Sequence, residues 1–528
     1  MKIPIAIIID NCSLESWQQE SINFISQYVD IRLVLNCQNT HNKKNLFKHF
    51  IYYLINFFSL KNRSTAKVKF INDNDIQCLS FNSIYKGSWQ SIPHDISKVI
   101  ASKEIKLVLK FGMSLLTIDK SLEQFDILSF HHGDPEFYRG RPAGFYEILN
   151  DADKTGIIVQ KLSNELDAGV VFARGYSQIC NYSYKKTSIN FFNNSKYILK
   201  HAILNYSSSQ VIYQEKLGKN YTLPSNYIAL VFIFKILKKK FNKVIYGIFY
   251  EKKWNIAKFS NINPVIRPNL TLDISDAKVP NIKEGYTFYA DPFFSSSGSM
   301  IRLEALNKSS GLGEIIEIDS TNLEYQRSIF DGDHFSYPFS IEHNEKSYLL
   351  PEISSHSHQM IFPEPFEWTS GIKLKGLEDF RIVDATLLRH EKKFYLFASF
   401  AESSMDCLQL FFSDELLGTY HAHPKNPIVI DPSCARMGGR IQFVDGKLYR
   451  YGQNNSYGYG QSLTVSIIEE LSAVAYREEK VSNVTFKNSF GPHTIDSFNN
   501  NFIFDFYRES FHFLAGYRRF LARLKKYL

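Results

Sequence analysis

The sequence of 528 residues lacks the patterns that mark several specialised classes of protein. Its cysteines show neither a CxxC pair nor Cys/His spacing, which argues against a disulfide framework and against a structural zinc site, so we expect no metal. There are six of them: Cys12, Cys37, Cys78, Cys180, Cys407 and Cys434. No run of 18 apolar residues occurs, which argues against a transmembrane helix.

The chain also lacks a large excess of charge of either sign. Lys and Arg number 61 and Asp and Glu 53, a net charge of +8. This mild excess favours an anionic substrate such as a nucleotide-sugar, or an anionic membrane surface, and does not indicate nucleic acid. The start, MKIPIAIIIDN, carries no small-residue cleavage site, so we interpret it as a buried strand rather than a signal peptide. We expect a cytoplasmic protein, with a peripheral position at the inner membrane face as an alternative.

The first part of the chain alternates predicted strands and helices. Apolar runs at 3–9, 31–36, 105–112 and 125–133 predict strands buried on both faces, and 14–28 predicts a helix. This alternation indicates an α/β doubly wound sheet, in which ligands lie at the carboxyl ends of the strands. We therefore expect a site in the loops after Lys110 and Ser129.

The region 186–285 is predicted to be a helical linker. Its segment 228–250 mixes apolar residues with five lysines, and its apolar core is too short to span a bilayer. We interpret this segment as a linker helix that covers an apolar face, with a peripheral membrane helix as the alternative. The last residues, 511–528, predict a basic amphipathic helix that either packs on one of the domains or lies on a membrane surface.

Residues 286–510 consist of short β-rich runs broken by turn residues. Similar segments recur at spacings of 47, 46, 56 and 53 residues. Their markers are Asp291, Pro338, Asp384, Arg440 and His493. A repeat of this length that contains several strands is typical of a propeller blade, so five markers predict an all-β five-bladed β-propeller. A β-sandwich with fortuitous spacing is the alternative.

Within residues 1–185, one segment carries most of the chemical information. It contains HHGD (131–134), YRGRPAGFYEI (138–148), TGIIVQKL (155–162) and ELDAGVV (165–171), preceded by FG (111–112). In order and spacing, these pieces resemble the formyltransferase family, which includes methionyl-tRNA formyltransferase and the sugar N-formyltransferases. The resemblance implies a formyltransferase-like α/β domain over residues 1–185 and 10-formyltetrahydrofolate as the donor.

That family uses an Asn-x-His pair and a distant Asp. The resemblance assigns the general base to His132 and its partner to Asp167. The Asn position then holds Phe130, and a frame shifted to His131 places Ser129 there, so the Asn is absent in either frame. His131 is a candidate for the missing hydrogen-bond donor. The alternatives are that these residues only cap turns, or that the domain has lost formyl transfer.

The loop GDPEFYRGRPAG (133–144) combines glycines with Arg139 and Arg141, which suits a phosphate or carboxylate. In the family the equivalent loop borders the folate and acceptor sites. We therefore expect substrate binding by Asp134, Arg139 and Arg141, together with Gly112. Arginines paired with Asp134 or Glu136 in a purely structural loop are the alternative.

The markers of the repeat also suggest a site on the propeller axis, where carboxylates from different blades converge as in inverting glycosidases. Its candidates are Asp291, Glu352, Asp384, Arg436, Arg440, Gln453 and His493. The segments ADPF and VDAT resemble five-bladed glycosidases such as arabinanases and xylosidases. The whole set over 286–480 more closely resembles the N-terminal propeller of plant glucosamine inositolphosphorylceramide transferase. Turn residues and arginine partners are the alternative interpretation.

These features predict an enzyme of surface-polysaccharide or glycolipid biosynthesis that transfers a formyl or related one-carbon group to an amino-sugar, either nucleotide- or lipid-linked. A glycosyltransferase or glycosidase with its site in the propeller is one alternative, and a non-catalytic glycan-binding protein is another. Formylation of methionyl-tRNA is disfavoured because +8 is a weak charge for a tRNA partner.

Overall fold

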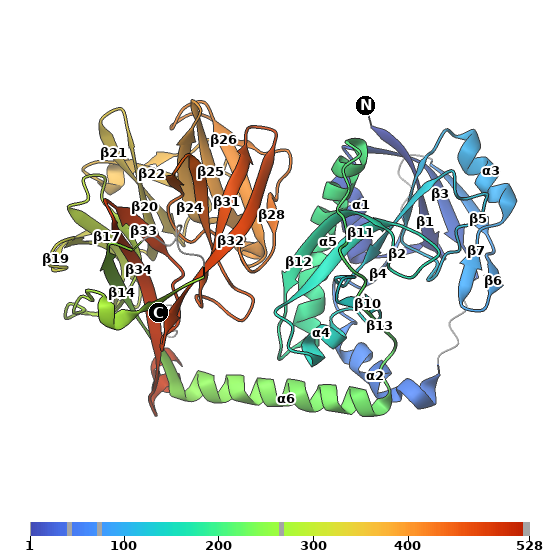
Figure 1. The fold of residues 1–528 in the computed structure, drawn as a ribbon, viewed down its shortest axis with the longest axis horizontal. Coiled ribbons are helices and arrows are strands. Elements are labelled where there is room, and N and C mark those ends of the chain that lie inside the picture. The colour runs from blue at the N-terminus through green and yellow to red at the C-terminus, as the bar shows by residue number, and fades with distance from the viewer. Residues whose placement is uncertain (1, 40–44, 71–75, 263–268, 521–528) are drawn as a thin grey trace. The chain divides into compact units, whose positions relative to one another are not determined.

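The computed structural model describes residues 2–39, 45–70, 76–262 and 269–520. The chain divides into two compact units, Met1–Phe241 and Asn242–Leu528, and the division falls within helix α6 (Asn226–Phe249). Unit 1 is an α/β domain and unit 2 is a five-bladed β-propeller (Figure 1). The predicted fold class is therefore confirmed. Among the described helices, none combines the length and the hydropathy that a membrane crossing requires.

Unit 1 is built on one mixed sheet with the order β12-β11-β9-β8-β1-β3-β5. Its parallel part contains β1 (Ile3–Asp10), β3 (Val29–Cys37), β5 (Gln77–Phe81), β8 (Leu107–Lys110) and β9 (Asp126–His131). Two antiparallel strands, β11 (Lys154–Lys161) and β12 (Val170–Gln178), extend it beyond β9. The short strands β2 (Ser13–Glu15) and β4 (Lys67–Lys69) attach beyond β1. The carboxyl ends of the parallel strands thus share one edge.

Helices cover both faces of this sheet (Figure 1). On one face α1 (Ser16–Ile25) contacts α5 (Tyr184–Ser207), which also packs on β11 and β12. On the other face α3 (His94–Ser102) shares a core with β1 and β3. The remaining elements are α2 (Leu46–Ser59), α4 (Phe145–Leu149), the hairpin β6 (Ile84–Lys86)–β7 (Trp89–Ser91), and the pair β10 (Tyr138–Gly140)–β13 (Lys219–Tyr221). A parallel sheet covered on both faces explains why its strands read as continuous apolar runs.

Unit 2 contains five sheets that follow one another along the chain. The first blade comprises β16 (Tyr286–Phe294), β17 (Met300–Asn307), β18 (Gly313–Asp319) and β19 (Tyr325–Phe330). The second comprises β20 (Phe335–His343), β21 (Lys346–Ile353), β22 (Met360–Pro363) and β23 (Ile372–Lys373). The third comprises β24 (Ile382–His390), β25 (Lys393–Phe400), β26 (Cys407–Ser413), β27 (His421–Ala422) and β28 (Val429–Ile430). The fourth comprises β29 (Gln442–Val444), β30 (Lys447–Gln453), β31 (Leu463–Leu471), β32 (Tyr476–Lys487) and β15 (Leu270–Asp273). The fifth comprises β33 (Ile495–Phe498), β34 (Asn501–Phe511) and β14 (Tyr250–Ser260). Three 3₁₀ turns cover Ile274–Asp276, Trp368–Ser370 and Ala401–Ser403.

The ring of blades is closed by two strands that precede the first blade. β14 pairs antiparallel with β34 along its whole length, and β15 pairs parallel with β32. The predicted linker 186–285 is therefore not a separate region, because α5 belongs to unit 1 and β14 and β15 belong to the propeller. The prediction failed because these strands find their partners more than 200 residues away, as in Trp254 with Tyr507, and local patterns carry no trace of such pairing.

The inner strands of the first three blades share a distortion. Asp291, Tyr337 and Asp384 have φ values of 50°, 46° and 51°, and the pairing with the next strand is irregular at each position. This is the signature of a β-bulge, which redirects the side chains around it. Two of the repeat markers, Asp291 and Asp384, thus hold the same structural position in different blades.

The predicted C-terminal helix is shorter in its described part than expected. Phe511 closes β34, residues 515–520 are helical, and residues 521–528 lie outside the described part of the chain. Arg519 Nη1 donates to the carbonyl oxygen of Tyr250 at 2.8 Å, which ties the segment to the start of β14.

Candidate functional site

A cavity of about 1130 Å³ opens at the carboxyl edge of the sheet in unit 1, where the doubly wound fold predicts a ligand. Lys110 at the end of β8 and Ser129 near the end of β9 both line it. Its wall also contains aromatic, aliphatic and charged side chains, including Tyr85, Trp89, Leu116, Leu162, Lys48, Arg141 and Asp167. The sequence therefore predicted the position of this cavity.

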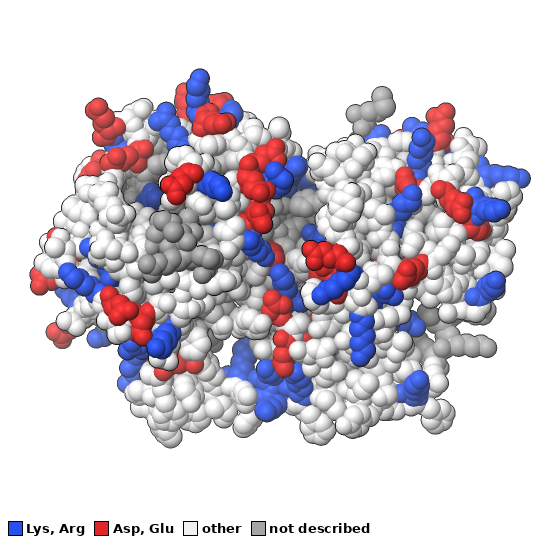
Figure 2. Space-filling model, viewed as in Figure 1, with Lys and Arg blue, Asp and Glu red and all other residues white. Residues whose placement is uncertain are grey.

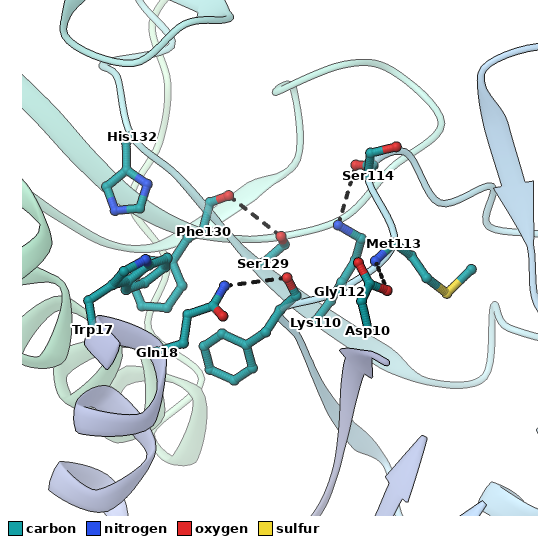
Figure 3. A pocket seen from close by; sticks show the side chains of 11 residues that line it. Asp10, Trp17, Gln18, Lys110, Gly112, Met113, Ser114, Ser129, Phe130 and His132 are labelled. Atoms are coloured by element: carbon teal, nitrogen blue, oxygen red, sulfur yellow. Dashed lines mark hydrogen bonds between the residues drawn. The ribbon is translucent and has the colours of Figure 1, made fainter. Parts of the chain in front are cut away.

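A second cavity of about 280 Å³ shares Lys110, Ser114, Ser129 and Phe130 with the first (Figure 3). Its other lining residues are Asp10, Trp17, Gln18, Phe111, Gly112, Met113 and His132. The strip formed by Lys110 and Ser129 is thus a wall common to two cavities, within reach of ligands in either.

Asp167 lies beside His131 rather than His132. The distance from Asp167 Oδ1 to His131 Nδ1 is 3.3 Å, and both side chains are largely buried. Asp167 Oδ2 accepts a hydrogen bond from the backbone N–H of Gly140 at 2.7 Å, and Oδ1 faces Gln160 Nε2 at 3.5 Å. The prediction that Asp167 orients His132 is therefore wrong. The shifted frame is the one that the structure supports, and it places Ser129 where the family has Asn.

Both ring nitrogens of His131 face acceptors. Nε2 lies 2.9 Å from the carbonyl oxygen of Tyr138, and Nδ1 faces Asp167. A neutral imidazole carries one N–H, so a bond from Nε2 to Tyr138 leaves Nδ1 without a proton. His131 can then accept a proton at Nδ1, where the carboxylate of Asp167 stabilises the resulting charge. A direct role of His131 as an oxyanion donor is not supported, because both ring nitrogens already face acceptors of the protein itself.

His132 lies in an aromatic environment. Its ring centroid is 5.0 Å from those of Trp17 and Phe192 and 5.1 Å from that of Phe191, and Nε2 lies 2.9 Å from Ser195 Oγ. Burial lowers the pKa of His132 to about 3, with a further contribution from His131. His132 is therefore neutral near pH 7, and no carboxylate in the described part of the chain forms an ion pair with it. Adjacent residues at a strand end point to opposite faces, which separates the two histidines.

Lys110 lines both cavities, whereas the sequence pointed only to the loop that follows it and not to its side chain. In the parallel pairing of β8 with β9, Lys110 is the partner of Ser129. Burial lowers the pKa of Lys110 to about 8, whereas the charges of Asp10 and Asp167 raise it. Its ammonium donates to the carbonyl oxygen of Ser114 at 3.4 Å. A cation thus lies beside the position at which the family has its Asn.

The predicted substrate-binding loop divides into two groups. Arg141 lines the large cavity and Gly112 the small one, where an added Cβ would lie 2.6 Å from Asp10 Oδ1. Arg139 instead pairs with Glu165 at 3.3 Å. Asp134 is buried, accepts a hydrogen bond from Tyr176 at 3.0 Å and lines neither cavity, so its predicted binding role is not supported.

The propeller axis of unit 2 holds most of the predicted residues in a buried network. Asp384 is paired with Arg436, whose Nη2 lies 3.2 Å from Asp384 Oδ1, and Gln453 Nε2 donates to Asp384 Oδ2 at 2.8 Å. The backbone N–H of Asp384 donates to Glu352 Oε2 at 3.3 Å. Four of the seven predicted axial residues therefore meet around one carboxylate.

A second group surrounds His493. It lies between Asp505, which contacts Nδ1, and Asp291, whose Oδ1 is 3.6 Å from Nε2. Thr494 Oγ1 donates to Asp291 Oδ1 at 2.6 Å. One ligand atom from each of Asp291, His493 and Asp505 lies within 4.8 Å of the others. Asp505 was not predicted from the sequence, because it lies on β34 and belongs to none of the repeat markers.

Arg440 does not join the axial network. Its Nε pairs with Asp496 Oδ1 at 2.9 Å and Nη1 donates to the carbonyl oxygen of Ser340 at 2.8 Å. For Arg440, and for Arg436 with Asp384, the interpretation of arginines as structural partners of carboxylates fits the geometry.

The environment separates the pKa values of the axial carboxyl groups. Burial raises the pKa of Glu352 to about 8 and that of Asp291 to about 6. Burial would lower the pKa of His493, but Asp505 and Asp291 raise it above its ordinary value. Burial also raises the pKa of Glu304 well above its usual range. Such separation is common at functional sites and also occurs in structural networks.

Residues 251–501 match the family model of glucosamine inositolphosphorylceramide transferase 1, N-terminal. The matched range begins in β14 and ends at the first residue of β34, so it covers the closing strand β14 and the propeller up to β33. The predicted resemblance of the C-terminal region to this family is therefore confirmed.

Curated relatives bear the same name. Glucosamine inositolphosphorylceramide transferase 1 of Arabidopsis thaliana is 30% identical over 236 residues, which are 41% of this chain and 30% of the relative. Its counterpart in Oryza sativa subsp. japonica is 29% identical over 211 residues, 37% of this chain and 28% of the relative. The chain thus spans about 30% of the length of the curated relatives it matches.

Solved structures match both folds at low identity. A phosphoribosylglycinamide formyltransferase from Anaplasma phagocytophilum is 12% identical, with 42% of this chain and 98% of that chain covered and a TM-score of 0.29. A sugar N-formyltransferase from Shewanella is 13% identical, with 44% of this chain and 88% of that chain covered and a TM-score of 0.27. An exo-β-1,3-galactanase from Phanerochaete chrysosporium is 12% identical, with 34% of this chain and 48% of that chain covered and a TM-score of 0.26. At these scores the fold assignment rests on the strand orders given above.

Proposed function

We propose that this chain is a transferase of surface-polysaccharide or glycolipid biosynthesis, in which unit 1 transfers a formyl or related one-carbon acyl group to an amino-sugar and the propeller binds the glycan. The observation that carries the proposal is the convergence of Lys110, Ser129 and the Asp167–His131 pair at one edge of the sheet. The names of the curated relatives, which specify glucosamine and a lipid, support an amino-sugar acceptor.

The large cavity fits a folate donor. Its volume of about 1130 Å³ suits an extended ligand, and Tyr85 and Trp89 offer aromatic surface for a flat ring. Lys48 and Arg141 offer cations for carboxylates. When bound, 10-formyltetrahydrofolate supplies the formyl group.

Three side chains of the protein then have distinct tasks. Lys110 stabilises the negative charge that develops on the formyl oxygen, a task that Asn performs in the formyltransferase family. Asp167, which lines the cavity, attracts the attacking amine and accepts its hydrogen bond. The proton that the amine loses would pass to the Asp167–His131 pair, at Nδ1 of His131. From there it would go to the nitrogen of the departing tetrahydrofolate as the bond between that nitrogen and the formyl carbon breaks. The missing Asn is thus replaced by a cation on the adjacent strand rather than by His131.

The test uses the full chain with 10-formyltetrahydrofolate and a panel of nucleotide-linked amino-sugars, and measures the N-formyl product by mass spectrometry. Lys110→Met should lower kcat by about 10²–10³ and leave folate affinity nearly unchanged, because the lost interaction belongs to the transition state. Lys106→Met, a change of an exposed lysine just before the same strand, should leave kcat unchanged. Adding Ser129→Asn to Lys110→Met should recover part of the activity. Absence of both folate binding and N-formyl product would refute the proposal.

A second candidate function places the chemistry on the propeller axis. It is favoured by the raised pKa of Glu352, about 8, next to Asp384, which is ion-paired with Arg436. A glycan-cleaving enzyme requires two carboxyl groups in different environments, one of which is kept protonated to act as the general acid. Loss of glycan processing in Glu352→Gln, with normal activity in Lys110→Met, would favour this candidate.

A further inference from the structure

Two neighbouring helices of unit 1 are apolar on both their inner and their outer sides. Tyr52 and Ile55 of α2 and Ala229 and Phe232 of α6 are buried in one core cluster. Asn226 joins the two helices, because its Nδ2 donates to the carbonyl oxygen of Phe47 at 2.7 Å and its Oδ1 accepts from the N–H of Ile51 at 3.0 Å. A surface helix of a globular protein normally has one apolar side and one polar side.

The outer sides carry large apolar side chains, each at least 41% exposed and Phe47 97% exposed. On α2 they are Leu46, Phe47, Phe50, Leu54, Phe57 and Phe58, and on α6 of unit 1 they are Tyr227, Leu230, Val231, Phe234, Leu237 and Phe241. We call these twelve residues the apolar face. Intervals of three and four residues place the set of α6, and the part of the α2 set that follows the kink at His49, on one stripe of each helix. Soluble proteins rarely expose a contiguous apolar surface of this extent.

The charged residues of the two helices themselves all have one sign. Neither α2 nor α6 contains an Asp or Glu. Together they carry Lys48, Lys235, Lys238, Lys239, Lys240 and Lys243. Lys235 and Lys239 pair with Asp151, at 2.5 and 3.3 Å, and Lys238 and Lys240 are exposed. Figure 2 shows lysines gathered over the middle of α6 and uncharged surface beside them.

We infer that the apolar face is a membrane-docking surface that lies in the interfacial layer of a bilayer containing anionic lipids. A bilayer supplies both an apolar layer for the phenylalanines and negative headgroups for the lysines. A second copy of the chain is a poorer occupant, because a twofold contact through this face would bring the lysines of the two α6 helices together. This inference is independent of the proposed reaction, since none of the twelve residues of the apolar face lines either cavity of unit 1.

Co-sedimentation of the full chain with vesicles tests the inference. Binding should be strong to vesicles of equimolar phosphatidylcholine and phosphatidylglycerol, weaker to phosphatidylcholine alone, and reduced by high salt. The double variant Phe47→Ser with Phe234→Ser should lower the partition coefficient at least tenfold, and since both side chains are exposed it should keep the native circular dichroism. Lys238→Ala with Lys240→Ala should lower binding to the anionic vesicles about 20-fold or more, at about fivefold per lysine.

Phe443→Ser is the matched control, because Phe443 is 69% exposed but lies on β29 of the propeller; its binding should equal that of the wild type. A tryptophan introduced by Phe234→Trp should be quenched by bromolipids if α6 lies in the interface. The inference is overturned if the wild type does not bind anionic vesicles, or if the Phe47→Ser with Phe234→Ser variant binds like the wild type. It is also overturned if sedimentation velocity shows a dimer that this double variant dissociates while vesicles are not bound.

Discussion

At the scale of single residues, the protonation state of Lys110 should govern the proposed reaction. Burial lowers its pKa to about 8, and only the ammonium form can stabilise a negative oxygen. We therefore expect kcat for formyl transfer to fall as the pH rises through about 8. Lys110→Arg should lose this alkaline limb, because a guanidinium stays charged. The measurement is kcat over a pH series at saturating substrates. If Lys110→Arg keeps the same alkaline decrease in kcat, that decrease belongs to another titrating group.

His132 should matter for stability rather than for turnover. Its ring packs against Trp17, Phe191 and Phe192 and its Nε2 contacts Ser195. His132→Ala should therefore lower the free energy of unfolding by about 2–4 kcal/mol, as for other large-to-small changes in packed sites. Urea unfolding measures this, with the exposed His94→Ala as the control. A variant of full stability that has lost turnover would restore His132 as the catalytic base.

Glu147 makes the stability of unit 1 depend on pH. It is buried on α4, accepts a hydrogen bond from Thr155 at 3.1 Å, and burial raises its pKa from 4.5 to about 7. The native state thus holds this proton more tightly than the unfolded chain does. Its stabilising contribution is complete below about pH 4.5 and is lost as the pH rises through 7.

Glu147→Gln keeps the shape of the side chain and removes its ionisation. The variant should be more stable than the wild type at pH 8, by up to about 3 kcal/mol, and the difference should shrink toward pH 5. Urea unfolding at both pH values measures it, with Glu123→Gln on the surface as the control. An equal difference at both pH values would show that Glu147 does not titrate in this range.

At the scale of elements, the bulges in β16, β20 and β24 explain how the propeller places side chains at its axis. Asp291 in β16 and Asp384 in β24 adopt the same left-handed backbone conformation, so the fold presents a carboxylate at equivalent points of two blades. Asp384 is then held by Arg436, from the segment before β29, and by Gln453 of β30. A charge pair inside the protein thus joins the blade that contains β24 to the blade that contains β29 and β30.

Removing the arginine from this pair should be costly. Arg436→Met leaves Asp384 buried without a counter-charge, which should lower the free energy of unfolding by about 3–5 kcal/mol. Asp384→Asn added to Arg436→Met should recover part of the loss. The surface pair of Lys393 with Asp414, whose aspartate is 82% exposed, is the control, and Lys393→Met should change stability by less than about 1 kcal/mol. Equal effects of the two single changes in urea unfolding would contradict this account.

At the scale of the whole molecule, the propeller depends on a strand that precedes its first blade. β14 pairs with β34 from Tyr250 with Phe511 to Ser260 with Asn501, and its Ile256 and Ala257 are fully buried. A fragment of residues 242–528 should therefore unfold cooperatively, whereas a fragment of residues 269–528 exposes the edge of β34 and should aggregate. Urea unfolding and light scattering separate these outcomes. A soluble, cooperative fragment 269–528 would show that closure by β14 is dispensable.

The sequence alone determined the classes of the two folds. Apolar runs from Ile3 onward identify strands covered on both faces, and the spacing from Asp291 to His493 counts the blades. Both signals are local or periodic, so they persist in the linear order of residues. The carboxyl-edge site followed from the same reasoning, because strand direction alone places Lys110 and Ser129 on one edge.

Only the tertiary structure decided which side chains meet. The resemblance to the formyltransferase family assigned the general base to His132, but β9 ends at His131. Because side chains alternate along a strand, His131 lies beside Asp167 and His132 lies in an aromatic cluster. Lys110 became a site residue through its register with Ser129, and β14 joined the propeller through pairing with a strand about 250 residues later. Contacts of this kind depend on chain segments brought together by folding, and a linear pattern does not record them.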